Sequence, residues 1–159
     1  MTDDESRDMI PRPFDSTEDK LLFLQENMVN FVNQYNLPII ETSLVVSKYL
    51  RILTQSLTDE ADKNNESIPS EILNPVPIEQ KELHTSISEF PLDTLLNQVD
   101  NERMDIFDTI IRTIINGSEL NFTDAILLLR DWESIIRKQL ANATSPGHLF
   151  SPVELPDDF

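Results

Sequence analysis

Apolar residues recur at three- and four-residue intervals along most of the chain, which is the period of an amphipathic α-helix. The pattern predicts helices at about 17–35, 39–57, 78–89, 91–116 and 122–141, with a pause near Asp100 in the fourth. No run alternates apolar and polar residues as a half-buried strand would, and only 2 glycines occur. We therefore predict an all-α fold, an irregular bundle of four to five helices.

The helix ends are marked by residues that cap or interrupt helices. Pro38 ends the first helix, because the residue before a proline avoids the helical conformation. Gly117 predicts another end, since glycine readily adopts the left-handed backbone of a helix C-terminus. The short connection at Pro38 predicts that the first two helices are antiparallel neighbours. Two pairs have the spacing of N-terminal caps: Ser16 with Asp19, and Asn121 with Asp124.

Proline and acidic residues divide the chain into a helical domain and polar segments. Residues 1–15 are predicted to form a disordered acidic arm, and residues 16–142 the helical domain. Within that domain, 58–77 is rich in Pro, Asp and Asn and is predicted to be a loop that lies across the bundle as a strap. Residues 143–159 are predicted to be an extended or disordered tail.

The first two predicted helices carry very little charge. Between residues 21 and 57 the only charged residues are Glu26, Glu41, Lys48 and Arg51, and amides and hydroxyls occupy the other polar positions. Interface cores are depleted of charge, so another chain could cover this hairpin; alternatively, the later helices of the same chain could cover it. We favour a partner chain, because four moderate helices cannot easily enclose apolar residues on all sides of two of them.

The residues predicted to bind this partner are large and apolar or aromatic. Trp132, the only tryptophan, is interpreted either as a core residue or as an interface anchor. A homo-oligomer is an alternative to a different partner chain. The predicted partner-binding residues are Leu24, Met28, Phe31, Tyr35, Val45, Tyr49, Ile52 and Trp132.

The charge of the chain bears on its partners. With 29 acidic and 12 basic residues the net charge is −17, which disfavours direct binding to nucleic acid or to an anionic membrane surface and favours a basic protein partner. The alternative hypothesis is an acidic inhibitor or DNA mimic that blocks a basic nucleic-acid-binding surface. A third is a bundle that binds a small apolar ligand in an internal cavity.

Residues able to support catalysis or metal binding are scarce. There is no cysteine, and neither His84 nor His148 has a companion at metal-ligand spacing. The 2 glycines cannot build a phosphate-binding loop. We therefore expect no enzymatic activity, no cofactor and no metal. No secretory signal or membrane-spanning segment is recognised, so we expect a soluble protein of the cytoplasm or nucleus, acting as a subunit or adaptor of a larger assembly.

Overall fold

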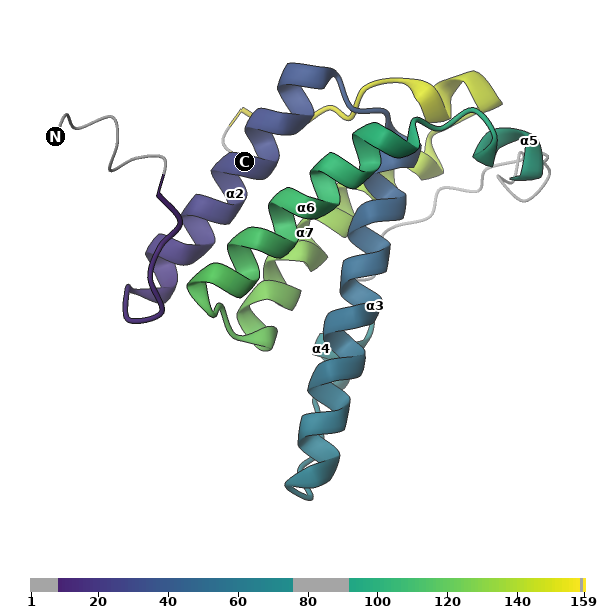
Figure 1. Cartoon of the computed structure of the whole chain (residues 1–159). Helices are drawn as coiled ribbons and strands as arrows, with labels where there is room; N and C mark the ends of the chain where they lie inside the picture. Colours follow the sequence, from purple (N-terminus) through teal and green to yellow (C-terminus); the bar gives the residue numbers. More distant parts are fainter. Residues whose placement is uncertain (1–8, 76–91, 158) are drawn as a thin grey trace, which may run out of the picture.

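The computed structural model describes residues 9–75, 92–157 and 159, and these form helices with no strand. In the described residues the only β-type pairing is an isolated bridge between Pro38 and Pro152. The predicted all-α bundle is confirmed, while the helix expected at 78–89 lies outside the described residues. The helices are α2 (Thr17–Tyr35), α3 (Ile39–Lys63), α4 (Ser70–Leu73), α5 (Leu92–Leu96), α6 (Asn101–Ser118) and α7 (Phe122–Ala141), followed by the 3₁₀-helix η2 (Pro146–Phe150) (Figure 1).

Both predicted N-terminal caps are present. The Ser16 side chain accepts a hydrogen bond from the backbone N–H of Asp19 at 3.2 Å, and the Asn121 side chain accepts one from Asp124 at 2.9 Å. Asp100 caps α6 in the same way, which explains why the predicted helix 91–116 is divided into α5 and α6. Each cap satisfies a backbone donor that the first turn of a helix leaves without a partner.

The prediction that the first two helices are antiparallel neighbours is wrong. α6 and α7 lie between α2 and α3, and each of them contacts both outer helices (Figure 1). α3 packs most extensively along α7, and α2 packs most extensively along α6. The apolar stripes of α2 and α3 therefore face the later helices instead of each other.

Two helix boundaries differ from the predictions. α3 continues to Lys63, so the expected loop at 58–77 begins only at residue 64; no proline interrupts 58–63, and Ala61 is buried. α6 continues past Gly117 to Ser118, and Glu119 takes the left-handed conformation instead (φ 51°, ψ 41°). Gly117 has a different role: a Cβ there would lie 3.1 Å from Ile10 Cγ2, so its small size admits the N-terminal segment.

Both ends of the described chain lie against the bundle. The predicted disorder at 1–15 does not extend over 9–15, where Ile10 approaches Gly117 and the Lys20 Nζ donates a hydrogen bond to the Pro13 carbonyl at 2.8 Å. The tail predicted to be extended or disordered also packs on the helices, with Leu149 and Val153 buried. It is held by backbone hydrogen bonds on either side of Pro152, where the chain is extended.

None of the helices within the described ranges is long and apolar enough to cross a membrane.

Candidate functional site

Most of the residues predicted to bind a partner belong to the protein's own core. Leu24, Met28, Phe31, Val45, Tyr49 and Trp132 are buried in the main hydrophobic cluster, each less than a tenth exposed. The other two, Tyr35 and Ile52, are 48% and 45% exposed. In this structure six of the eight residues are therefore part of the core, and Tyr35 and Ile52 are the two of the set that are accessible.

Side chains of α6 and α7 contact the buried positions of the hairpin 21–57. The ring of Phe31 stacks on that of Phe107 in α6, with a centroid separation of 5.2 Å. The indole N–H of Trp132 in α7 donates a hydrogen bond to the Gln25 side chain at 2.6 Å. The Tyr49 hydroxyl donates one to the Asp108 carbonyl at 3.2 Å. The amide of Gln25 and the hydroxyl of Tyr49 thus serve internal contacts between helices, whereas other polar residues of the hairpin, such as Asn30 and Gln34, are exposed.

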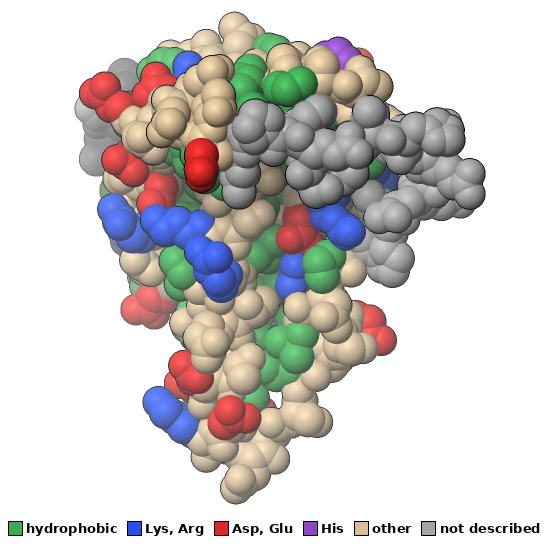
Figure 2. Space-filling model, turned by 90° about the vertical axis from the view of Figure 1, so that its right-hand side faces the viewer, with side chains coloured by type: hydrophobic (Ala, Val, Ile, Leu, Met, Phe, Trp, Pro, Cys, Tyr) green, Lys and Arg blue, Asp and Glu red, His purple; other side chains and the backbone are tan. Residues whose placement is uncertain are grey.

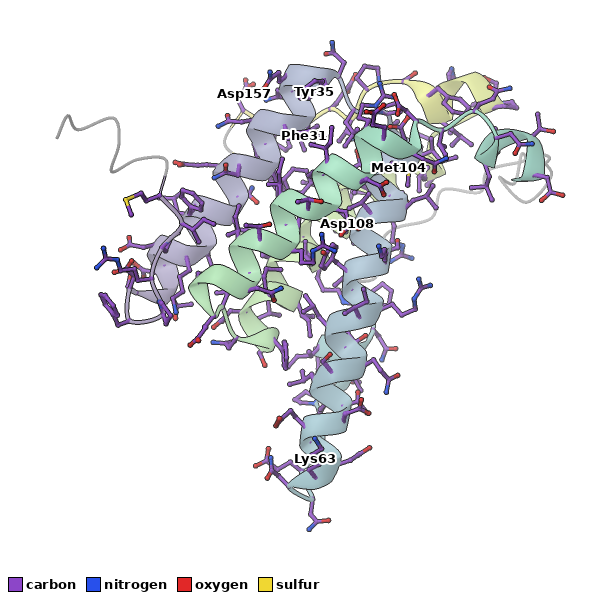
Figure 3. All side chains as sticks on the ribbon, viewed as in Figure 1. Phe31, Tyr35, Lys63, Met104, Asp108 and Asp157 are labelled. Carbon is purple, nitrogen blue, oxygen red and sulfur yellow. The ribbon has the colours of Figure 1, made fainter. Side chains whose placement is uncertain are left out.

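The described residues contain an open apolar groove at the far end of α3, with a volume of about 740 Å³. α3 projects beyond α6 and α7, and Lys63 lies at its free end (Figures 1 and 3). The groove forms where this projecting part meets the turn between α6 and α7, and we call it the α3 groove. Its apolar surface includes Leu57, Ala61, Ile115, Leu120 and Phe122.

One wall of the α3 groove is the segment 64–75, which we call the strap. Ile68, Pro69 and Ile72 of the strap line the groove. The guanidinium of Arg130, buried on α7, donates hydrogen bonds to the backbone carbonyls of Ile72 at 3.3 Å and Leu73 at 2.9 Å. A buried arginine with several such bonds holds the backbone in one place, so the position of this wall depends on α7.

Carboxylates surround the apolar part of the groove. Glu60, Glu66 and Glu119 are all exposed and all line it. Glu119 holds its position with a left-handed backbone, which costs a residue other than glycine roughly 1–2 kcal/mol. The groove therefore combines an apolar floor with a negative rim.

Basic side chains gather elsewhere, beside the middle of α3, whereas acidic ones predominate toward its projecting end (Figure 2). Lys48 pairs with Asp108 at 2.8 Å, and Figure 3 shows Asp108 on α6 next to α3. Burial acts to raise the pKa of Asp108, but hydrogen bonds with Lys48 and Tyr49 and the charges of Lys48 and Arg112 outweigh it, so the pKa is lowered. Burial also raises the pKa of the Tyr49 hydroxyl, so this group stays protonated.

Within the described ranges, no group of three or more His, Asp or Glu side chains is placed to hold a metal ion. His148 is exposed, and its Nδ1 accepts a hydrogen bond from the Thr144 backbone at 3.0 Å, while His84 lies outside the described residues. No family model, curated protein or solved structure matches this chain. The groove is therefore interpreted from its own geometry.

The sequence did contain one signal for the groove. Ile68 and Ile72 recur in a segment otherwise rich in Pro, Asn and Glu, and the expected strap is found there. The contribution of the α6–α7 turn could not be predicted, because it depends on how far α3 projects beyond its neighbours.

Proposed function

We propose that this protein is a non-enzymatic helical adaptor or subunit of a larger intracellular assembly, and that it binds a short segment of another protein in the α3 groove. The observation that carries the proposal is the groove itself, an apolar trough of about 740 Å³ between α3, the strap and the α6–α7 turn. A peptide that lays apolar side chains into such a trough gains affinity from burying them. The absence of cysteine supports a reducing compartment.

The shape of the groove favours a peptide over a small ligand. It is open to solvent, whereas small-molecule sites enclose most of the ligand surface. Its floor comes from elements far apart in the sequence, namely Leu57 on α3 and Phe122 on α7. An elongated apolar segment contacts both at once, as a short amphipathic helix does when it docks in a groove.

The proposal moves the predicted interface away from the hairpin face. Tyr35 and Ile52 remain exposed, but they stand on different helices separated by α6 and α7, and neither lines the groove. Isolated exposed apolar residues are common on protein surfaces and need no partner. An apolar trough built from three elements is a stronger indication of a docking site.

The test is a selection of binding peptides from a displayed library of about 16 residues, enough for about four helical turns. Selected peptides are expected to bind the full chain and to lose affinity for the variant Ile68→Asp. Ile68 lines the groove from a loop and is only partly buried, so this change places a charge in the groove with little effect on folding.

Three variants serve as controls, each placing the same charge on an exposed apolar position outside the groove: Leu22→Asp, Tyr35→Asp and Ile52→Asp. The proposal expects all three to bind like the natural chain. Loss of binding in Tyr35→Asp or Ile52→Asp, with Ile68→Asp unaffected, would return the interface to the hairpin and contradict the proposal. Thermal unfolding checks that each variant folds.

A further inference from the structure

We infer that the segment bound in the α3 groove is basic, with lysine or arginine side chains flanking its apolar anchors. This inference rests on the proposed function and adds the chemistry of the partner. It follows from the carboxylates that line the groove and from their lack of ion-pair partners within the described chain. It follows also from the left-handed backbone of one of these residues, Glu119.

The charged residues lining the groove are all of one sign. Glu60 follows Leu57 by three residues on α3, Glu66 belongs to the strap, and Glu119 follows α6, so the carboxylates come from three sides of the apolar floor. Among the described residues that line the groove, none is lysine or arginine. A cationic side chain entering from any of these sides meets a carboxylate close to apolar surface, where screening by water is reduced.

These carboxylates are not used inside the protein. Two acids elsewhere have cationic partners: Glu41 binds Arg103 through two hydrogen bonds of 2.6 and 2.7 Å, and Glu133 binds Arg130 at 2.8 Å. Within the described ranges, Glu60, Glu66 and Glu119 form no ion pair. They are therefore free to pair with a ligand.

Glu119 occupies a position that glycine or asparagine would fill at lower conformational cost. Its backbone is left-handed (φ 51°, ψ 41°) and closes α6, as its N–H bonds to the Asn116 carbonyl at 3.3 Å. Glycine is usual at such a position because it has no Cβ. A glutamate there gives up stability and supplies a charge at the rim of the groove. The Glu119 carboxylate is placed to bind a lysine or arginine side chain of the bound segment.

The occupant that fits these features is an amphipathic helix with apolar side chains on one face and lysine or arginine on its borders. An acidic segment would place like charges against three carboxylates, and an uncharged segment would leave them without partners. Like-charge contacts at an interface disfavour the wrong partner, so the rim also provides specificity.

The experiment uses a fluorescent amphipathic peptide of leucine and lysine, about 14 residues long, and a counterpart in which every lysine is replaced by glutamine. Binding to the full chain is followed by fluorescence anisotropy. We expect the lysine peptide to bind at least about tenfold more tightly than the glutamine peptide, and to weaken as salt rises from about 50 to about 500 mM, because exposed ion pairs are screened.

Single charge removals locate the interaction. Glu119→Gln is expected to weaken binding of the lysine peptide by about two- to fivefold, the usual range for one exposed ion pair. The matched control is Glu26→Gln, which removes the same charge from an exposed position on α2 and is expected to have no effect. Equal weakening by both substitutions would attribute the attraction to the net charge of −17 and overturn the inference.

A triple variant, Glu60→Gln with Glu66→Gln and Glu119→Gln, is expected to weaken binding by about tenfold or more while thermal unfolding remains cooperative. Its control removes three exposed carboxylates outside the groove: Glu26→Gln, Asp131→Asn and Glu154→Gln.

The outcomes separate this inference from the proposed function. If both peptides bind equally and both lose affinity for Ile68→Asp, the groove binds a segment but does not select a basic one, and the inference fails alone. If neither peptide responds to Ile68→Asp, the groove is not the docking site and the proposed function fails as well.

Discussion

The two ends of α3 lie in different surroundings. Its first half is enclosed by α6, α7 and η2, and Val45 and Tyr49 are buried there. Its last turns project beyond α6 and α7, and within the described ranges they line the groove together with the strap and the α6–α7 turn (Figure 1). The first half belongs to the core, whereas the projecting half forms the α3 groove.

If the α3 groove is the docking site, as we propose, the docking site does not coincide with the part of the chain that has the least charge. α6 and α7 cover the apolar core positions of the segment 21–57, as the contact of Phe31 with Phe107 illustrates, while uncharged residues such as Asn33 and Gln34 are exposed. The groove instead lies where the sequence becomes acidic, around Glu60 and Glu66. In this chain, part of the segment with little charge is buried by other helices of the same chain, whereas the groove that we propose as the docking site lies among acidic residues.

The largest expected effect is a loss of stability in the enclosed core of the bundle. Trp132 is fully buried, bonds to Gln25 on α2, and meets the ring of Phe159 edge-on with a centroid separation of 4.9 Å. Trp132→Ala is expected to lower the free energy of unfolding by about 3–5 kcal/mol, because it leaves a cavity where α7, α2 and the C-terminus meet. Urea denaturation followed by circular dichroism measures this change.

Trp132→Phe, which keeps an aromatic ring but no N–H, should retain more of the stability. A loss below about 1 kcal/mol for Trp132→Ala would show that this end is not a packed core, and would reopen the hairpin as a surface for a partner.

The next effect, on both stability and peptide binding, concerns the strap, which forms one wall of the α3 groove. Arg130→Gln removes the hydrogen bonds to the strap and leaves Glu133 without its cation. We expect a loss of about 2–3 kcal/mol in unfolding free energy, and weaker binding of the lysine peptide because the strap is no longer held. Arg112→Gln, at an exposed arginine, is the control and should change stability by less than about 0.5 kcal/mol. Unchanged peptide binding in Arg130→Gln would show that the strap is not needed.

A smaller effect of opposite sign is expected at the rim of the groove. Glu119→Gly should raise the free energy of unfolding by about 1 kcal/mol, because glycine accepts the left-handed conformation without a Cβ penalty. The same change should weaken binding of the lysine peptide. A variant that is more stable and yet binds the peptide normally would remove the reason given for the glutamate at this position.

The smallest expected effect is on how stability changes at acid pH, through the contact between Lys48 on α3 and Asp108 on α6. The pKa of Asp108 is lowered in the folded protein, so its carboxylate contributes stability above its unfolded pKa, and this contribution is lost as pH falls through the folded pKa. Asp108→Asn should therefore reduce the loss of stability between about pH 5 and pH 2, by less than about 1 kcal/mol because Lys48 is half exposed. Denaturation midpoints across this range measure it; identical slopes for both proteins would contradict the prediction.

The positions of the helices could be predicted from the sequence better than the way in which they pack. Local signals such as the caps at Ser16 and Asn121 act within one turn, and the structure contains them. The neighbours of α2 depend instead on contacts far along the chain, such as Trp132 with Gln25, which no local pattern encodes. The short connection at Pro38 favoured direct packing of α2 on α3, but the apolar faces of α6 and α7 fill the space between them.

The candidate site was predicted only in part. The apolar residues of the strap were recognised as able to lie across the bundle, and Ile72 does so. The end of α6 was misplaced by two residues, because Gly117 has a local reason to end a helix but here makes room for Ile10. The resulting left-handed conformation of Glu119 follows from tertiary packing, so its role at the groove could not be predicted.

The most direct test of the central claim is amide hydrogen exchange of the full chain with and without a peptide selected for binding. We expect added protection at 57–72 and 115–123, around the α3 groove, with residues 21–50 protected in the free chain and unchanged by the peptide. New protection confined to 21–50, with none around the groove, would show that the low-charge hairpin is the docking surface and would contradict the account.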